Sequence, residues 1–157
     1  MADKRHENRE NTFILLFAKE FDRQANPNDY YNAYIENNDV QYTDHVKDTF
    51  IGVCEQCETI DSMIEEVSVK WKLSRMATVT RTVLRLAVYE MINSDVPVKV
   101  IINEAIEIDR KYDDENSTGF INGILNKIAR KRGLIEATAE VSSSDSVEDT
   151  DTTATQE

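Results

Sequence analysis

The sequence predicts an all-α protein, a compact single-domain bundle of about six or seven helices. Three observations support this prediction. The chain has 157 residues but only four glycines and two prolines, so turns are few and long helices are expected. Apolar residues recur at steps of three and four, as on one face of a helix, along most of the chain. No segment shows the period-two alternation of a half-buried strand between turn signals.

The first predicted helix covers residues 9–24, RENTFILLFAKEFDRQ, and turns Phe13, Leu16, Phe17 and Phe21 towards the core. NPND at 26–29 ends it, and a short amphipathic helix follows at 30–37. Thr43 then caps a long helix, in which a break would fall near Ser68. Its apolar stripe has steps of four and three and consists of Val46, Phe50, Val53, Cys57, Ile60, Ile64, Val67 and Trp71.

Three further segments complete the prediction. Residues 76–93 form another helix. Pro97 suits the first turn of the next helix, 97–112. DDENS at 113–117 is a turn and cap, and the last helix ends near Arg132 with Gly133 at its C-terminus. The helical domain therefore spans residues 1–133. Residues 134–157 contain seven acids and no base, with few sizeable apolar residues, so an acidic disordered tail is expected.

The charge of the chain limits the classes of partner. The net charge is −12, which argues against binding nucleic acid through bulk charge alone. Residues 67–99 carry six Lys/Arg and two acids, however, so one local basic surface remains available. No run approaches ~18 apolar residues, and the N-terminus lacks the apolar region of a secretory signal. We therefore expect a cytoplasmic protein that does not engage a membrane.

No constellation predicts an enzyme. Cys54 and Cys57 match C-x-x-C, but a zinc site would lack further ligands and a redox pair would lack its βαβ context. We interpret both cysteines as small buried hydrophobic residues. His6 and His45 are interpreted as surface residues, and no nucleophilic triad or phosphate-binding loop is present. No catalytic residue, metal site or cofactor is predicted.

The last helix contains an unusual pair of glycines. At 100° per residue, Gly119 and Gly123 fall nearly opposite the apolar side of this helix, and Phe120 lies at its edge, close in angle to Lys127. Glycine costs a helix interior about 1 kcal/mol relative to alanine, so a reason for the pair is expected. Either a neighbouring helix packs against the glycines, or they clear a surface where RNA approaches and Phe120 stacks on a base.

Three blocks resemble the C-terminal signatures of the bacterial transcription antitermination factor NusB family: VLRLAVYEM at 83–91, DVPVKVIINEAIEIDRKY at 95–112 and FINGILNKIAR at 120–130. Their order and spacing make the resemblance specific, and it extends over residues 5 to about 132. It implies a compact all-α domain that binds boxA-type single-stranded RNA. It also implies a complex with NusE, a small-subunit ribosomal protein, that acts on RNA polymerase during ribosomal RNA transcription.

The resemblance also implies roles for individual residues. Lys4, Arg5 and Arg9 match the family's Arg-rich segment that holds RNA phosphates, although His6, Glu7 and Asn8 thin it here. The start of the last helix falls where the family meets RNA, and Asn116 would read a base edge or cap the helix. The implied RNA contacts beyond the N-terminal segment are Lys70, Lys72, Lys99, Asn116, Ser117, Phe120 and Lys127. Of these, Lys70, Lys72 and Lys99 could equally be ordinary solvated side chains.

Phe17 and Thr80 are the expected contacts with NusE. Phe17 holds a usual aromatic position and would be an anchor or part of the core, whereas Thr80 stands where an acid is common and removes one expected ion pair. Two alternatives remain. One is a protein-only adaptor or homodimer without RNA affinity; the other is the NusB-like domain of a ribosomal RNA methyltransferase, of which this chain would be a fragment.

Overall fold

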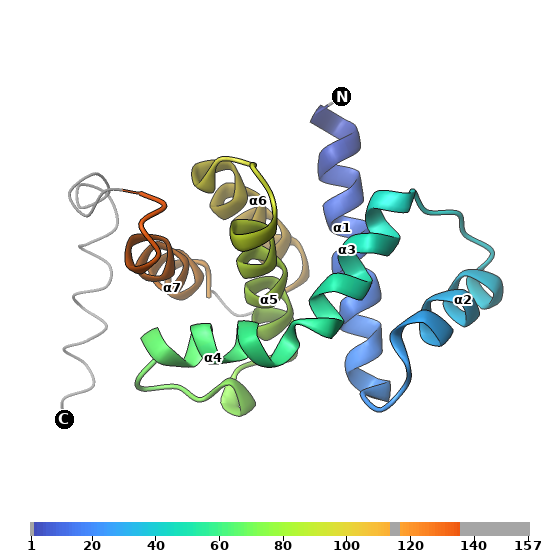
Figure 1. Ribbon diagram of the computed structural model, residues 1–157, viewed down its shortest axis with the longest axis horizontal. Coiled ribbons are helices and arrows are strands. Elements are labelled where there is room, and N and C mark those ends of the chain that lie inside the picture. The colour runs from blue at the N-terminus through green and yellow to red at the C-terminus, as the bar shows by residue number, and fades with distance from the viewer. Residues whose placement is uncertain (1, 114–116, 136–157) are drawn as a thin grey trace.

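A computed structural model describes residues 2–113 and 117–135, and the regular secondary structure of this part of the chain is entirely helical. The seven α-helices that it contains and two short 3-10 helices surround one core (Figure 1). In chain order they are α1 (Ala2–Lys19), η1 (Glu20–Asp22), α2 (Pro27–Asn38), α3 (Asp44–Glu55), α4 (Cys57–Val67), η2 (Leu73–Arg75), α5 (Thr78–Asn93), α6 (Val98–Tyr112) and α7 (Thr118–Lys131). The predicted fold class is confirmed.

Several helix ends follow the expected local chemistry. Thr43 caps α3 by accepting a hydrogen bond from the Val46 backbone N–H at 3.2 Å. The break before α2 falls at residues 23–26, slightly earlier than the predicted NPND segment, because Asn26 caps α2 and Pro27 occupies its first helical position. Gly133 has a φ of +73°, the left-handed conformation that ends a helix.

The predicted long helix from Thr43 to Trp71 is wrong, because it divides at Gln56 into α3 and α4. The two halves pack against different neighbours: α3 lies against α1, while α4 lies against α5 and α7. One straight helix could not follow both. The second break falls at Ser68, where expected. Trp71 lies beyond this break and is 48% exposed.

The prediction that Phe21 lies in the core is also wrong, because Phe21 is 75% exposed. α1 ends at Lys19 and the chain tightens into η1. A 3-10 helix turns about 120° per residue, so the α-helical stripe no longer keeps position 21 on the apolar side. The first helix also begins earlier than predicted, at Ala2, which makes the N-terminal basic segment helical.

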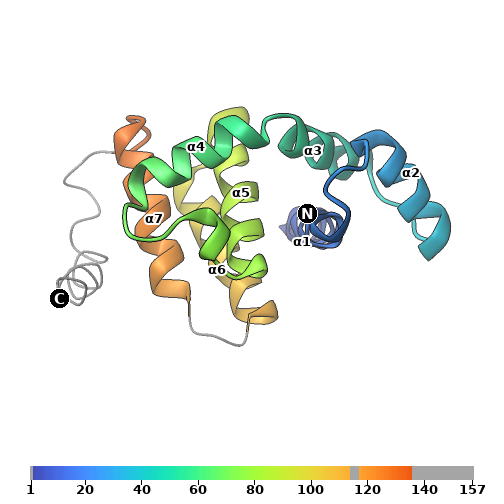
Figure 2. The same cartoon turned by 90° about the horizontal axis from the view of Figure 1, so that it is seen from below.

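α5 occupies the centre of the bundle, with α1 on one side and α4, α6 and α7 on the others (Figures 1 and 2). Ten of its sixteen residues are buried, so α5 is covered on more than one face. Two charged side chains lie among them. Arg85 donates to Asp61 at 2.8 and 3.0 Å and to Glu20 at 2.9 Å, which satisfies a guanidinium that has lost its water.

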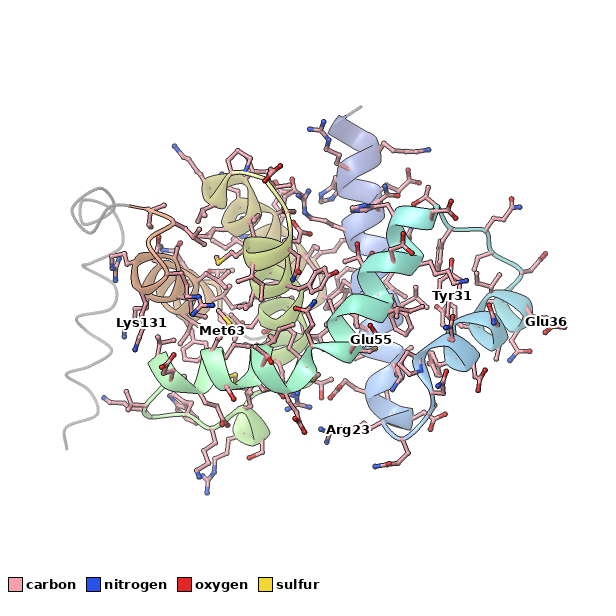
Figure 3. All side chains as sticks on the ribbon, in the orientation of Figure 1. Arg23, Tyr31, Glu36, Glu55, Met63 and Lys131 are labelled. Carbon is pink, nitrogen blue, oxygen red and sulfur yellow. The ribbon has the colours of Figure 1, made fainter. Side chains whose placement is uncertain are left out.

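α2 is held at the edge of the bundle by aromatic contacts. Tyr31 is buried between α2 and α3, where its ring centroid lies 6.1 Å from that of Phe50 (Figure 3). Tyr30 stacks on the same Phe50 ring at 6.2 Å. At the opposite end of the molecule, Lys131 of α7 pairs with Glu66 of α4 at 3.6 Å.

Candidate nucleic-acid interface

The first turn of α1 presents two exposed basic residues, Lys4 and Arg5. Because α1 begins at Ala2, Arg5 and Arg9 are one turn apart on the same side of a regular helix. The helix end that carries them projects from the bundle, as the N label in Figure 1 shows. Lys4 and Arg5 can therefore approach a phosphate backbone without rearrangement of the fold.

Arg9 is engaged inside the protein. Its Nε lies 2.9 Å from both carboxylate oxygens of Glu90 on α5, and its Nη1 lies 3.9 Å from Glu104 on α6. The Arg9 and Glu90 side chains are only 11% and 10% exposed. Burial raises the pKa of Glu90, and Arg9 opposes this rise. In this arrangement Arg9 fastens α1 to the centre of the bundle.

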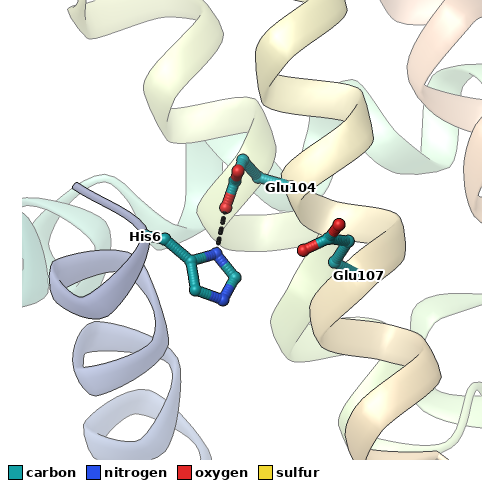
Figure 4. Close-up of side chains that lie close together, drawn as sticks. All are labelled: His6, Glu104 and Glu107. Atoms are coloured by element: carbon teal, nitrogen blue, oxygen red, sulfur yellow. Dashed lines mark hydrogen bonds and ion pairs between the residues drawn. The ribbon is translucent and has the colours of Figure 1, made fainter. Parts of the chain in front are cut away.

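His6 faces α6 across the same junction. Its Nδ1 lies 2.5 Å from Glu104 Oε1 (Figure 4). Its Nε2 lies 3.8 Å from Glu10 Oε1. The hydrogen bond to Glu104 raises the pKa of His6 above its usual value. His6, Glu104 and Glu107 are also the group in the described residues whose ligand atoms could hold a metal ion, all within 4.8 Å of one another.

The start of α7 is fixed by a polar network rather than left open. Ser117 Oγ lies 2.8 Å from Asp109 Oδ2 and 2.7 Å from Asp113 Oδ2, and Thr80 Oγ1 lies 3.4 Å from the same Asp113 oxygen. A hydroxyl has one proton, so the two carboxyl groups are best satisfied when one of them is protonated. Burial raises the pKa of Asp109 to about 6, in agreement with this requirement.

This network decides where two predicted site residues lie. Thr80 is 4% exposed and thus offers little surface to a protein partner. The Ser117 hydroxyl is occupied by Asp109 and Asp113 and points into the protein. Asn116 lies outside the described residues.

Phe120 and Gly123 differ in their surroundings. Phe120 is half-buried and packs against the core, so part of its ring serves the fold. A Cβ built on Gly123 would meet nothing within 4 Å. No helix of the described chain therefore explains the absence of a side chain at Gly123, and the outer face of α7 is open there. Lys127 is half-buried on the same helix.

An aromatic cluster lies at the other end of α1. The rings of Phe13 and Phe17 stack at 6.0 Å, and Phe21 contacts Phe17 edge-on at 5.5 Å. Phe17 is half-buried, whereas Phe21 is 75% exposed. Phe17 and Phe21 thus form a small exposed aromatic edge at this end of the molecule, and exposed apolar patches are candidates for protein contacts.

Comparison with known proteins identifies the family of the chain. Residues 6–130 match the model of the NusB family, which is most of the described helical domain. The chain belongs to the NusB family. Its similar proteins include the transcription antitermination protein NusB of Anaeromyxobacter sp. (strain Fw109-5), 59% identical over 78 residues, and that of Clostridium perfringens (strain SM101 / Type A), 44% identical over 103 residues. These matches cover 50% and 62% of this chain, and just over half (54%) and 76% of the two relatives.

Solved structures of the family have the same fold. T. maritima NusB is 36% identical with a TM-score of 0.70, and the similarity covers 81% of this chain and 91% of that one. A structure described as antitermination factors NusB and NusE in complex with dsRNA also gives a TM-score of 0.70, at 26% identity over 83% of this chain and 99% of that one. The NusB resemblance inferred from the three sequence blocks is thus confirmed.

The predicted RNA contacts of this NusB-family chain lie on four separate segments. Lys4 and Arg5 are on α1, and the exposed Lys99 is in the first turn of α6. Phe120 and Lys127 are on α7, which α5 and α6 separate from α1 in both views (Figures 1 and 2). The segment between α4 and η2, which carries Lys70 and Lys72, lies at the opposite end from the start of α1 (Figure 1).

Sequence reasoning missed the residues that lie between these places. Arg110 and Lys111 occupy the last turn of α6, and both are exposed. Together with His6, Glu10, Glu107 and Ile108 they line an open groove beside α1. The adjacent Arg and Lys near a helix end were the available signal, but they look like ordinary C-terminal helix cations.

The cysteines agree with their interpretation as packing residues. Cys54 and Cys57 are half-buried free thiols. Burial raises the pKa of Cys54 to about 11 and also raises that of Cys57, so neither is a thiolate at neutral pH. Among the described residues, no helix has both the length and the apolar character needed to cross a membrane.

Proposed function

We propose that this chain is a transcription antitermination factor that binds boxA-type single-stranded RNA together with NusE and acts on RNA polymerase during ribosomal RNA transcription. Family membership supports the first part of this proposal. The similar structure of NusB and NusE with RNA supports the two partners. The contact residues proposed below are drawn from this chain's own surface.

The exposed pair Lys4 and Arg5 is the observation that carries the RNA proposal. Both lie on a helix end that projects from the bundle, and neither forms an ion pair with an acid in the described part of the chain. Each phosphate that they neutralise releases counterions, so binding should weaken with salt. Arg9 has a different role, because Glu90 already holds its guanidinium. It positions the basic turn by fastening α1 to α5.

A single strand that leaves Lys4 and Arg5 can reach α7 by crossing the last turn of α6. Arg110 and Lys111 lie on this route, and the open face at Gly123 follows. Lys111 pairs with Glu10, but unlike Arg9 its side chain is 61% exposed and remains open to a phosphate. The exposed part of Phe120 then offers an edge on which a base can stack. Lys99 lies in the first turn of α6 and would extend the basic surface near α1. Lys70 and Lys72 belong to the segment between α4 and η2, which lies at the opposite end of the molecule from the start of α1 (Figure 1), so we leave them out of this proposed route.

We propose the Phe17–Phe21 edge as the contact with NusE. The Phe21 ring is preorganised by Phe17 and exposes most of its area, which are the properties of an interface anchor. Thr80, by contrast, is enclosed by Asp113 and Ser117 and is not part of this proposed contact.

The experiment is a titration of labelled boxA-type RNA with the full chain at several salt concentrations. The Lys4→Ala/Arg5→Ala double variant should bind more weakly, and its salt slope should be shallower by about 1.4, because each phosphate contact of a single strand contributes about 0.7. Arg23→Ala is the matched control, since Arg23 is an exposed cation that follows the other end of α1. Equal losses in both variants would contradict a specific basic turn.

Double-stranded RNA of the same sequence forms a second arm, because the similar NusB–NusE structure contains dsRNA. Preference for the single strand supports base stacking at α7. Equal binding of both forms would limit the interface to phosphate contacts.

A protein-only adaptor is the second candidate. It is favoured by one observation: the acids Glu90 and Glu104 already engage Arg9 and His6 of the N-terminal segment. This candidate predicts NusE binding through Phe21 without measurable RNA affinity, so the same titration separates the two functions.

A further inference from the structure

The junction between α1 and α6 gathers three side chains of metal-binding type. His6 projects from α1, while Glu104 and Glu107 project one after the other from the facing side of α6 (Figure 4). Residues three apart on a helix share one face, so both carboxylates can point at the same imidazole. The three residues are close only because the fold brings positions 98 or more apart in sequence together.

We propose that His6, Glu104 and Glu107 bind one divalent transition-metal ion, Zn²⁺ or a metal of similar preference, between α1 and α6. Imidazole nitrogen and carboxylate oxygen are both zinc ligands, and three protein ligands leave one position for water. The imidazole selects against Mg²⁺ and Ca²⁺, which prefer oxygen ligands.

The distances are close to those of such a site. With metal–ligand bonds of about 2.0–2.2 Å, two ligand atoms of a tetrahedral ion are roughly 3.4 Å apart. Here His6 Nδ1 and Glu104 Oε1 are 2.5 Å apart, and all three ligand atoms lie within 4.8 Å of one another. The separation that a tetrahedral ion requires between its ligand atoms lies between these two distances. The ion would replace the proton between Nδ1 and Oε1, and Glu107 would close on it by a change of side-chain rotamer.

The neighbouring charges leave these ligands available. Glu10 is held by Lys111, 2.6 Å away, and by the Tyr112 hydroxyl. Arg9 is held by Glu90, with only a 3.9 Å contact to Glu104. Glu107 makes no hydrogen bond or ion pair within the described part of the chain. One carboxylate of the cluster therefore has no structural task that metal binding would disrupt.

Solvent access completes the site. His6, Glu10, Glu107, Ile108, Arg110 and Lys111 line an open groove, so a hydrated ion can enter without movement of the helices. His6 is 37% exposed and Glu104 23%, which leaves their side chains room to adjust. A bound ion would cross-link the second turn of α1 to α6. This inference does not depend on the proposed RNA or NusE binding.

The test uses the untagged full chain and competition for Zn²⁺ with a chromophoric chelator. One Zn²⁺ per chain should bind, and His6→Gln and Glu107→Gln should each weaken it by about tenfold or more, since even outer-shell changes cost that much. His45→Gln and Glu58→Gln are the matched controls, because each removes an exposed residue of the same type on another helix. Both controls should leave the affinity within twofold of wild type.

A second measurement keeps the inference testable if a variant folds poorly. In the wild-type chain, one equivalent of Zn²⁺ should shift the imidazole NMR signals of His6 and leave those of His45 in place, whereas millimolar Mg²⁺ should shift neither. The proposal is overturned if His6→Gln binds Zn²⁺ as tightly as wild type. It is likewise overturned if the His6 signals do not move, which would assign any bound zinc to another part of the chain.

Discussion

Replacing Gly123 by alanine should stabilise the protein. Gly123 lies in the middle of α7, where glycine loses more backbone freedom on folding than alanine does. A Cβ at this position meets no atom within 4 Å, so the substitution brings no clash to offset the gain. A glycine whose replacement stabilises the protein is expected where the residue serves a function outside the fold.

The magnitude follows from the helix scale. Glycine in a helix interior is about 0.8–1.0 kcal/mol less favourable than alanine, and with an open outer face most of this difference should appear. For a domain of this size, about 1 kcal/mol raises the melting temperature by roughly 3 °C. If the open face of α7 admits RNA, the same variant should bind boxA-type RNA more weakly, because the added methyl group occupies that face.

Thermal unfolding and urea unfolding of wild type and Gly123→Ala measure the gain. Gly52→Ala is the matched control, because a Cβ on Gly52 would overlap the hydroxyl and ring of Tyr89. This helical glycine lets α3 approach α5, so its replacement should destabilise the protein. A stability loss in Gly123→Ala would refute the open face, and a gain without any change in RNA affinity would place the RNA elsewhere.

Three other substitutions test the packing, the polar network and the partner surface. Arg85→Met should lower the free energy of unfolding by about 3–5 kcal/mol, because it leaves Asp61 without a cation and Glu20 with Arg81 alone. Urea unfolding measures this loss, and a loss below 1 kcal/mol would contradict it. Asp109→Asn should remove a pH dependence. The folded-state pKa of Asp109 is raised from 3.8 to about 6, so this group makes wild type less stable as the pH rises through this window. The loss should be about 1–2 kcal/mol after allowance for screening, and the variant should lack it. Equal slopes of unfolding free energy against pH in the two proteins, from pH 4 to 7, would refute this prediction. Phe21→Ser should weaken NusE binding by about tenfold without lowering the melting temperature, since the ring is 75% exposed; calorimetric titration decides, and unchanged affinity would exclude this edge.

The periodic spacing of apolar residues predicted the helices because burial of one face is a local property of the sequence. Residues 76–93 and 97–112 fall within two residues of α5 and α6 for this reason. The division at Gln56 could not be predicted in this way. The stripe continues through it without a change of step, and the break depends on which helices α3 and α4 pack against.

The spacing of apolar residues also could not predict which charged side chains are buried. The apolar positions of α5 identify its inner side, but they do not show that the opposite side is covered too. Arg85 and Glu90 are buried only because α1, η1 and α4 supply Arg9, Glu20 and Asp61 from distant parts of the chain. Such partners become visible when the helices are assembled.

The residues of the candidate site also fall into those that the sequence indicated and those that only the fold brings together. Lys4, Arg5 and the α7 glycines were indicated by sequence, through family resemblance and helix angle respectively. The cluster of His6, Glu104 and Glu107 was not, because His6 alone resembles a surface residue and its acids lie on α6. The sequence predicted that Arg9 contacts RNA phosphates, whereas in the structure its guanidinium binds the Glu90 carboxylate of α5.

The most direct test of the proposed function is the affinity for boxA-type single-stranded RNA measured with and without NusE at two salt concentrations. We predict that NusE strengthens RNA binding, that binding falls as salt rises, and that Lys4→Ala/Arg5→Ala loses most of the salt-sensitive part. Absence of RNA binding at low salt in the presence of NusE would contradict the RNA role and leave a protein-only adaptor.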